Sequence, residues 1–433
     1  MFYWWLLFLL LKLGLVSLVP LTSDENYYWV WAQNLCLSYF DHPPFVAWLF
    51  KLGSWLPDSM LKWPAVLLGH LSLLIWGRLL SNIGFDNEQI YKWFLLVVLA
   101  PLVGLSSMVL TPDLPLLFFY SISIYAFERA LTIKKLKYYL LFGLGLGLGF
   151  TSKYLILLII PCLCIYLLVS GQYRNLSWKN LIGLLLFAIL GALPVILWNY
   201  QNDWKSFRFQ IDHGVGKRDW KPMWTVEYIA SVLMFILPQY WFTFFKSFFI
   251  SKQKLLISLS IPIILFFLFT SFRSKVEANW SQLAFLPIIS LLAYCDRSRW
   301  RTLLTVFIWS GLLSTLIIYW NKPWFPSCPD KMCEPKRYFK VIDISNNYKP
   351  FMASNYQMAS YLWFQKKSPV YKLYDMSRTD FFDTLPESKP NIKEFYLAKH
   401  LITEFPSWLI KENYKTELVL HIDEDLDLIR VYR

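Results

Sequence analysis

Long apolar blocks recur from the N-terminus to about residue 320 and constrain the fold more than any other feature of the sequence. Runs such as 2–21, 95–110 and 303–320 approach the roughly 20 residues that a helix needs to cross about 30 Å of hydrocarbon. Of the 433 residues, 56% are apolar and only 16% are charged. This composition is typical of a polytopic membrane protein, so we expect an α-helical chain that crosses a membrane many times.

Eleven membrane spans are predicted. The first block lacks basic residues at its start and a small-residue cleavage site, so it is interpreted as a retained span and not as a signal peptide. In the span over 138–152, glycines at every second position from 143 to 149 do not recur at every fourth residue, but they still indicate close approach of neighbouring helices. The predicted spans are 2–21, 62–80, 93–110, 113–130, 138–152, 154–170, 180–199, 226–245, 255–272, 282–294 and 302–320.

Basic residues concentrate in every second loop. With a cytoplasmic N-terminus, the short cytoplasmic loops hold 13 Lys or Arg in 46 residues, at a higher density than the opposite loops. The positive-inside rule expects this asymmetry. The net charge of +13 fits loops at anionic head groups, and no run interleaves basic and aromatic residues as a nucleic-acid surface does, so nucleic acid is excluded as a partner. These loops are 81–92, 129–137, 171–179, 246–254 and 295–301.

The composition becomes mixed polar and apolar after residue 320, where four prolines mark a linker. The sequence therefore predicts a transmembrane domain over 1–320, with an external loop at 22–60, and a small extracytoplasmic α+β domain over 321–433. Cys328 and Cys333 in the linker are either a disulfide or two free thiols, and they lack the second pair that a zinc site needs. In the tail, a helix is predicted at 356–365 and strands at 370–374, 394–397, 417–422 and 426–432.

Polar residues that can carry chemistry gather in the predicted external loops. Acids, histidines and cations beside helix ends in lipid are what an enzyme needs to bind an anionic lipid phosphate and to deprotonate a hydroxyl. No predicted cytoplasmic loop shows a comparable variety. The residues singled out are Asp24, Glu25, Tyr28, Asp41, His42, Asp113, Lys153, Arg208, His213, Glu277, Asn279 and Trp280.

Seven segments in a fixed order resemble the signatures of glycosyltransferase family 39. They are DENYYWVWAQNL, SYFDHPPFVAW, LTPDLPLLFF, GLGLGFTSKY, FQIDHG, KVEANW and NYQMASYLWF, and they extend from the first span into the tail. This C-type (GT-C) family is similar to protein O-mannosyltransferases and lipid A aminoarabinose transferases. The resemblance implies a bacterial inner-membrane enzyme that transfers one sugar from a polyprenyl (undecaprenyl) phosphate to an extracytoplasmic acceptor such as lipid A or lipopolysaccharide.

The resemblance implies that an acid in the first external loop is the catalytic base, and Asp24 is the matching residue. A carboxylate beside the acceptor hydroxyl would take its proton while the sugar becomes oxocarbenium-like. The alternative is that Asp24 caps a helix beginning at Glu25. Asp113 matches a second family acid near the active site, and its alternative role is to start a helix after Pro112.

Donor phosphate binding is assigned to four basic residues, which are His42, Lys153, His213 and Arg208. The family has a stronger cation where this chain has His42, so Lys153 is expected to contribute to phosphate binding. A lone Lys between two apolar runs is costly without a partner or a route to water, which favours a role for Lys153. Snorkelling is the alternative for Lys153, and Arg208 can be a membrane-surface anchor. The residues expected to bind sugar or acceptor are Glu25, Tyr28, Asp41, Glu277, Asn279, Trp280, Tyr356 and Gln357.

The sequence leaves several alternatives open. No cofactor is expected, although Asp24 and Asp113 together could hold a divalent cation. Transfer to protein or of a whole oligosaccharide fits the same architecture. A flippase for lipid-linked sugars predicts polar residues near the midplane and an internal repeat, whereas His70 is the main midplane polar residue and no repeat is detected.

Overall fold

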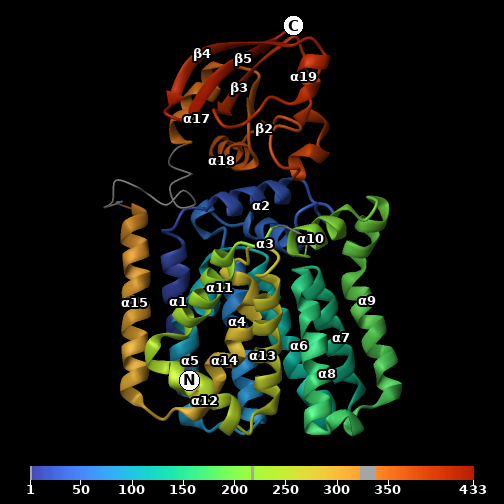
Figure 1. Ribbon diagram of the computed structural model, residues 1–433, viewed down its shortest axis with the longest axis vertical. Helices are drawn as coiled ribbons and strands as arrows, with labels where there is room; N and C mark the ends of the chain where they lie inside the picture. Colours follow the sequence, from blue (N-terminus) through green and yellow to red (C-terminus); the bar gives the residue numbers. More distant parts are fainter. Residues whose placement is uncertain (1, 216–218, 322–337) are drawn as a thin grey trace. The chain divides into compact units, whose positions relative to one another are not determined.

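The computed structural model describes residues 2–215, 219–321 and 338–433, which form two compact units (Figure 1). Met1–Val19 and Leu37–Ile318 form the helical unit, and Pro20–Cys36 and Tyr319–Arg433 form the sheet unit. The linker prolines, Cys328 and Cys333 lie outside the described residues.

Most helices of the helical unit are apolar and run between its two ends, whereas the shorter helices Phe45–Gly53 and Lys205–Val215 lie across one end (Figure 1). We call the end with residues 111–113 and 151–153 the site end, and the opposite end, with residues 83–86 and 296–298, the basic end. The helices are α1 (Phe2–Val16), α3 (Phe45–Gly53), α4 (Trp63–Asn82), α5 (Asn87–Leu99), α6 (Asp113–Ile133), α7 (Leu136–Phe150), α8 (Ile159–Ser170), α9 (Trp178–Gln201), α10 (Lys205–Val215), α11 (Pro222–Ile236), α12 (Pro238–Ile250), α13 (Lys254–Thr270), α14 (Gln282–Cys295) and α15 (Arg299–Asn321).

The predicted helical class is confirmed, but the number of eleven spans is not. Among the described residues, four helices are long and apolar enough to cross a membrane, and two bent pairs would raise the number to six. Four shorter apolar helices, at Phe2–Val16, Leu136–Phe150, Tyr154–Ser170 and Lys254–Thr270, account for other predicted spans.

Two predicted spans are broken. The pair α11 and α12 bends by 98°, because Leu237 has a positive φ of 66° and Pro238 has no backbone N–H to continue the helix. The predicted span over 93–110 bends by 65° after α5, where Pro101 opens a π-helical turn. A proline lies at both breaks, although Pro194, Pro262 and Pro287 lie inside continuous helices of the same unit.

The alternating glycines of α7 form two interleaved faces. A Cβ on Gly143 or Gly147 would lie 2.1 or 2.4 Å from a backbone oxygen of α9. A Cβ on Gly145 would instead meet the Ser123 side chain of α6 at 2.6 Å. The prediction of close helix approach is therefore confirmed, and the face towards α9 does use every fourth residue, Gly143 and Gly147.

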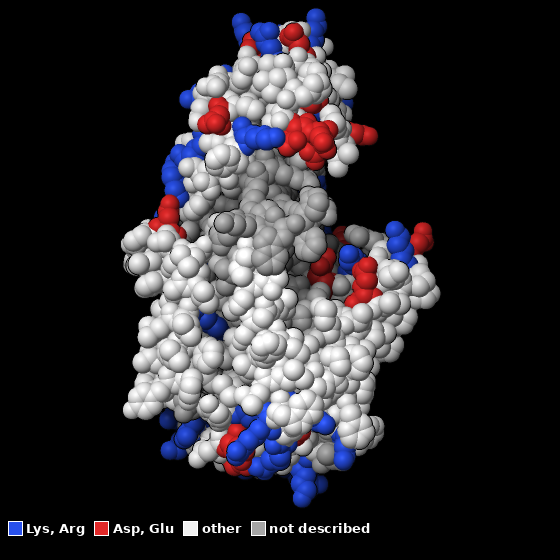
Figure 2. All heavy atoms as spheres, turned by 90° about the vertical axis from the view of Figure 1, so that its left-hand side faces the viewer, with Lys and Arg blue, Asp and Glu red and all other residues white. Residues whose placement is uncertain are grey.

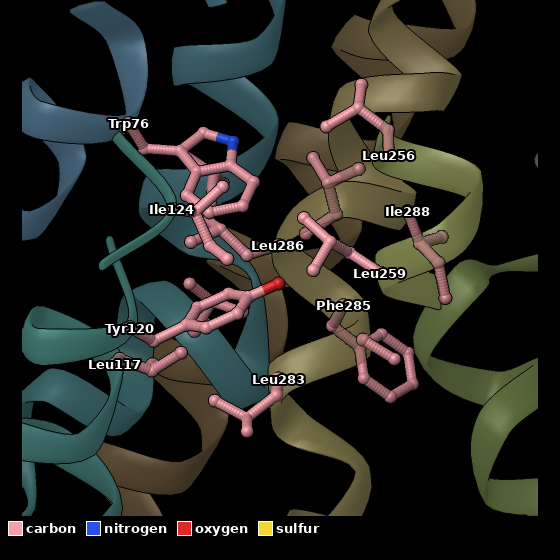
Figure 3. Packing of buried hydrophobic residues seen from close by; sticks show 14 of the residues in the cluster. Trp76, Leu117, Tyr120, Ile124, Leu256, Leu259, Leu283, Phe285, Leu286 and Ile288 are labelled. Carbon is pink, nitrogen blue, oxygen red and sulfur yellow. The ribbon is translucent and has the colours of Figure 1, made fainter. Parts of the chain in front are cut away.

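An aromatic and aliphatic core joins α4, α6, α13 and α14 (Figure 3). Trp76 stacks on Tyr120 with ring centroids 5.3 Å apart, and its indole N–H donates to Ser290 Oγ at 2.9 Å. Leucines of α13 and α14 fill the space beside this pair (Figure 3). This core fixes the start of α6, which carries Asp113.

A five-stranded mixed sheet confirms the predicted α+β tail. The strand order is β2-β1-β3-β5-β4, in which β1 is parallel to β2 and β3, and β5 is antiparallel to β3 and β4. The predicted helix and all four predicted strands are present. The additional strand β1 was missed because three residues are too few to show an alternating pattern. The elements are α2 (Ser23–Gln33), α17 (Phe339–Asn347), β1 (Phe351–Ala353), α18 (Tyr356–Lys366), β2 (Tyr371–Lys372), β3 (Glu394–His400), α19 (Ser407–Lys411), β4 (Lys415–Asp423) and β5 (Leu426–Tyr432).

Candidate active site

A buried ion pair at the site end joins three segments that are distant in sequence. Lys153 Nζ donates to Asp113 Oδ1 at 2.7 Å, and Asn279 Nδ2 donates to Asp113 Oδ2 at 2.8 Å. The side chains of Lys153 and Asp113 are only 11% and 8% exposed. Both carboxylate oxygens are thus engaged by protein donors, so Asp113 in this arrangement orders Lys153 and Asn279.

Local structure explains why Asp113 occupies this position. It is the first residue of α6, directly after Pro112, so the predicted helix start is confirmed. A carboxylate in the first helical turn is stabilised by the unpaired backbone N–H groups there. Helix initiation and contact with Lys153 therefore coexist at this residue.

The loop that contains Asp41 and His42 is tied to the same end. The Phe45 N–H donates to the carbonyl of Thr151 at 3.0 Å, two residues before Lys153. The side-chain amide of Gln210 donates to the carbonyl of Asp41. Asp41 is buried and His42 is half-buried, so this loop is a fixed part of the helical unit.

An ammonium group in this setting can bind an anion. Lys153 has three N–H donors, and the contact with Asp113 uses one of them. In a site with little water, an added phosphate oxygen would gain more from this charge than in bulk solvent. Snorkelling alone does not describe Lys153, since its charge is paired with a carboxylate inside the unit.

The other predicted residues of this end are less closely joined. Glu277 is exposed, and Trp280 is half-buried with its ring centroid 6.1 Å from that of Phe267. Arg208 is exposed on α10, and no contact among the described residues joins its side chain to Lys153. The side chain of His213 lies outside the described residues.

Helix α2 of the sheet unit carries Asp24 and Glu25. Thr22 caps this helix through its hydroxyl, which accepts from the Glu25 N–H at 3.2 Å, while the Glu25 carboxylate accepts from the Thr22 N–H at 2.9 Å. The alternative that Asp24 caps a helix beginning at Glu25 is therefore wrong. Asp24 is an exposed residue of the first turn, and Glu25 is fully buried and occupied by capping.

Aromatic packing joins α2 to α18 within the sheet unit. The ring centroid of Tyr27 lies 4.5 Å from that of Tyr356, and the Tyr27 hydroxyl accepts from the Phe381 N–H at 2.7 Å. Tyr28 is buried on the same helix, and Gln357 is half-buried on α18. Asp24, Tyr356 and Gln357 thus share one unit, whereas their approach to Lys153 stays a prediction.

Sequence reasoning missed two contributors to the helical unit's site end. The FQIDHG segment was singled out for His213, but Gln210 makes the contact with Asp41, and Ser206 lies 2.9 Å from the Tyr154 hydroxyl. Residues four apart share a helix face. The polar spacing of Ser206 and Gln210 was therefore the available signal for the inner face of α10.

Comparisons with known proteins agree with the expected family. Residues 41–198 match the family described as dolichyl-phosphate-mannose-protein mannosyltransferase. The chain is 26% identical over 381 residues to the lipid A galacturonosyltransferase RgtD of Rhizobium johnstonii, covering 81% of this chain and 79% of that protein. It is 29% identical over 184 residues to the lipopolysaccharide core galacturonosyltransferase RgtA of the same organism, covering 41% and 37%.

Solved structures of ArnT from Cupriavidus metallidurans have the same fold. The form bound to undecaprenyl phosphate superposes with a TM-score of 0.68 at 14% identity and covers 99% of this chain and 98% of that chain. The apo form gives the same TM-score and covers 97% of its chain. The expected resemblance to the C-type glycosyltransferases is thus confirmed: residues 41–198 match the mannosyltransferase family, the named curated relatives are glycosyltransferases, and so is this protein.

Proposed function

We propose that the protein transfers a single sugar from a polyprenyl phosphate, such as undecaprenyl phosphate, to lipid A or lipopolysaccharide outside the cytoplasm. The names of RgtD and RgtA support the acceptor, and the undecaprenyl phosphate bound to ArnT supports the donor. Galacturonic acid is the first sugar to test, since both named relatives transfer it.

The observation that carries this proposal is the buried Lys153–Asp113–Asn279 network at the site end. Lys153 would bind the donor phosphate with its two remaining N–H groups. Asp113 would hold the ammonium in place, and Asn279 would fix the rotation of that carboxylate. A cation fixed at a helix end can receive a lipid phosphate from the bilayer without prior reorganisation.

The proposed reaction is an inverting single displacement. The acceptor hydroxyl attacks the anomeric carbon as the bond from that carbon to the phosphate oxygen breaks. Asp24 takes the hydroxyl proton, and the polyprenyl phosphate leaves with the bonding electrons. Its new charge would be stabilised by Lys153, His42, His213 and Arg208.

Sugar and acceptor binding is assigned to the polar and aromatic residues that the family resemblance singled out. In the helical unit, Asn279 would contact the sugar only through an N–H not used by Asp113, and Trp280 would offer a flat face. In the sheet unit, Glu25 is committed to the helix cap, so the exposed Asp24 is the better candidate base of the two. The assigned binding residues remain Glu25, Tyr28, Asp41, Glu277, Asn279, Trp280, Tyr356 and Gln357.

The proposed orientation places the N-terminus in the cytoplasm and residues 321–433 in the periplasm of a bacterial inner membrane. The asymmetry of Lys and Arg between alternate loops supports it. No metal is assigned to the reaction, because Lys153 already supplies the positive charge beside Asp113. Transfer is accordingly expected to continue in EDTA at an unchanged rate.

Transfer by purified protein tests the proposal. Protein and labelled undecaprenyl-phosphate sugar are incubated with lipid A, and lipid products are resolved by mass spectrometry. Asp24→Asn is expected to slow transfer by about 100-fold or more, the range of a lost general base. Asp219→Asn, an exposed acid in the same chain, is the control and keeps the wild-type rate.

Unchanged transfer by Asp24→Asn would remove Asp24 from the mechanism. Product on protein, or transfer of a whole oligosaccharide, would establish one of the alternative acceptor or donor classes. Movement of the lipid-linked sugar across vesicles without a new glycosidic bond would identify a flippase instead.

A further inference from the structure

A pocket at the basic end is unrelated to the candidate active site. Its volume is about 380 Å³, and it lies between the beginning of α5 and the turn from α14 to α15. Lys153 and Asp113 lie at the site end of the same unit, so neither belongs to this pocket. We propose that it binds one anionic phospholipid, with the lipid phosphate at Arg297 and Arg299.

The floor of the pocket is a fixed ion pair. Lys92 Nζ donates to Asp296 Oδ2 at 2.9 Å, and these side chains are only 11% and 9% exposed. Lys92 also donates to the backbone carbonyls of Asp296 and Ser298. With its N–H groups used in this way, Lys92 shapes the floor and leaves anion binding to residues nearer the rim.

The rim carries loosely held arginines. The Arg297 guanidinium lies 3.2 Å from Asp86, and that of Arg299 lies 3.4 Å from Glu88. The two arginine side chains are 63% and 87% exposed, and such surface pairs contribute little to stability. Both guanidinium groups can therefore turn to a phosphate, which they bind in a bidentate manner.

Charge at this end also favours an anion. Four basic side chains pair with only three acids at this end. Lys92 and Arg301 both pair with Asp296, the latter at 3.5 Å, and the other pairs are Arg297 with Asp86 and Arg299 with Glu88. Figure 2 shows Lys and Arg gathered at the lower end of the helical unit, below a broad face with few charged side chains. A phosphate bound at the rim would balance the remaining positive charge.

One wall of the pocket is apolar, which distinguishes a lipid from a soluble anion. Tyr91, Leu95 and Leu303 line it, and Leu303 is 65% exposed. The exposed face of α15 continues along Trp300 and Phe307, as expected for a surface in contact with acyl chains. A phosphate at the arginines with a hydrocarbon chain along Leu303 satisfies both parts of the pocket.

Native mass spectrometry of the full chain in neutral detergent tests this site. Phosphatidylglycerol and phosphatidylcholine with identical acyl chains are the probes. Wild-type protein is expected to retain one phosphatidylglycerol more tightly than phosphatidylcholine. The double variant Arg297→Ala/Arg299→Ala should bind phosphatidylglycerol at least about tenfold more weakly, as expected for the loss of hydrogen bonds to a charged group.

The control variant is Lys135→Ala/Lys179→Ala, which removes the same charge from two exposed residues at the beginnings of α7 and α9. It should bind phosphatidylglycerol as the wild type does. If both double variants bound phosphatidylglycerol equally weakly, the effect would depend on net charge alone, and the proposal would be overturned. Equal retention of the two lipids by the wild type would also overturn it, as would displacement by millimolar inorganic phosphate, which would indicate a soluble anion.

Discussion

Replacing Lys153 with methionine separates the structural role of the buried ion pair from its proposed role in donor binding. Among the described residues, the variant leaves Asn279 as the remaining side-chain donor to the Asp113 carboxylate, whose side chain is only 8% exposed. Removing one member of a buried pair typically costs about 3–5 kcal/mol, because the other charge stays buried without compensation. Asp113→Leu is expected to cost a similar amount.

The double variant Asp113→Leu/Lys153→Met removes both charges and keeps the approximate volume. Replacing a buried pair by apolar residues is often neutral, so the double variant should regain most of the lost stability. Transfer should nevertheless stay at least about 100-fold below wild type, because the proposed phosphate ligand is gone. Stability is measured as reversible unfolding in mixed detergent and activity with labelled donor.

Lys92→Met at the basic end provides the matched control. It breaks a second buried pair, with Asp296, in the same unit, so it should lower stability without removing a proposed donor contact. Three results would refute the reasoning: an unaltered stability of Lys153→Met, additive losses in the double variant, or wild-type transfer by that double variant.

Further predictions concern packing and the sheet unit. Gly147→Ala places a Cβ 2.4 Å from the carbonyl oxygen of Ala188, so it should destabilise the helical unit by about 1–3 kcal/mol. The control Gly311→Ala, whose Cβ would have no atom within 4 Å, should leave stability unchanged. Thermal unfolding in detergent compares the two variants. Lys372 is fully buried and lies 2.8 Å from Asp380 and 2.6 Å from a second carboxylate, so Lys372→Met should cost about 3–5 kcal/mol. Protection of β2 and β3 from hydrogen exchange would fall accordingly, and unchanged protection would contradict this account of the ion cluster.

The sequence predicted helix and strand locations well where periodicity or long apolar runs carried the signal. Strands β4 and β5 were predicted from short alternating segments, although β5 is buried along most of its length, and the helices follow apolar blocks. The break at Leu237 was missed because a run of apolar residues does not reveal a reversal of φ at one residue. Glycines 143 and 147 were recognised as small, but their partners on α9 depend on tertiary packing.

Side-chain partners in the candidate site were beyond prediction from a single sequence. Lys153 and Asp113 are separated by 40 residues, and Asn279 is 166 residues from Asp113. Each residue was selected by its chemistry, but their contact depends on how α6, α7 and α14 pack. The buried hydrogen bonds of Lys12 were missed for the same reason. Lys12 donates to the Gly104 carbonyl at 2.6 Å and to Ser107 Oγ at 3.2 Å, and these contacts exist because α1 packs beside the broken span over 93–110.

Binding of undecaprenyl phosphate to the purified chain tests the central claim most directly. The folded double variant Asp113→Leu/Lys153→Met is compared with wild type and with Arg297→Ala/Arg299→Ala. Donor binding at the site end predicts at least about tenfold weaker binding by the first variant and wild-type binding by the second. Wild-type affinity in the Lys153 double variant would contradict the account.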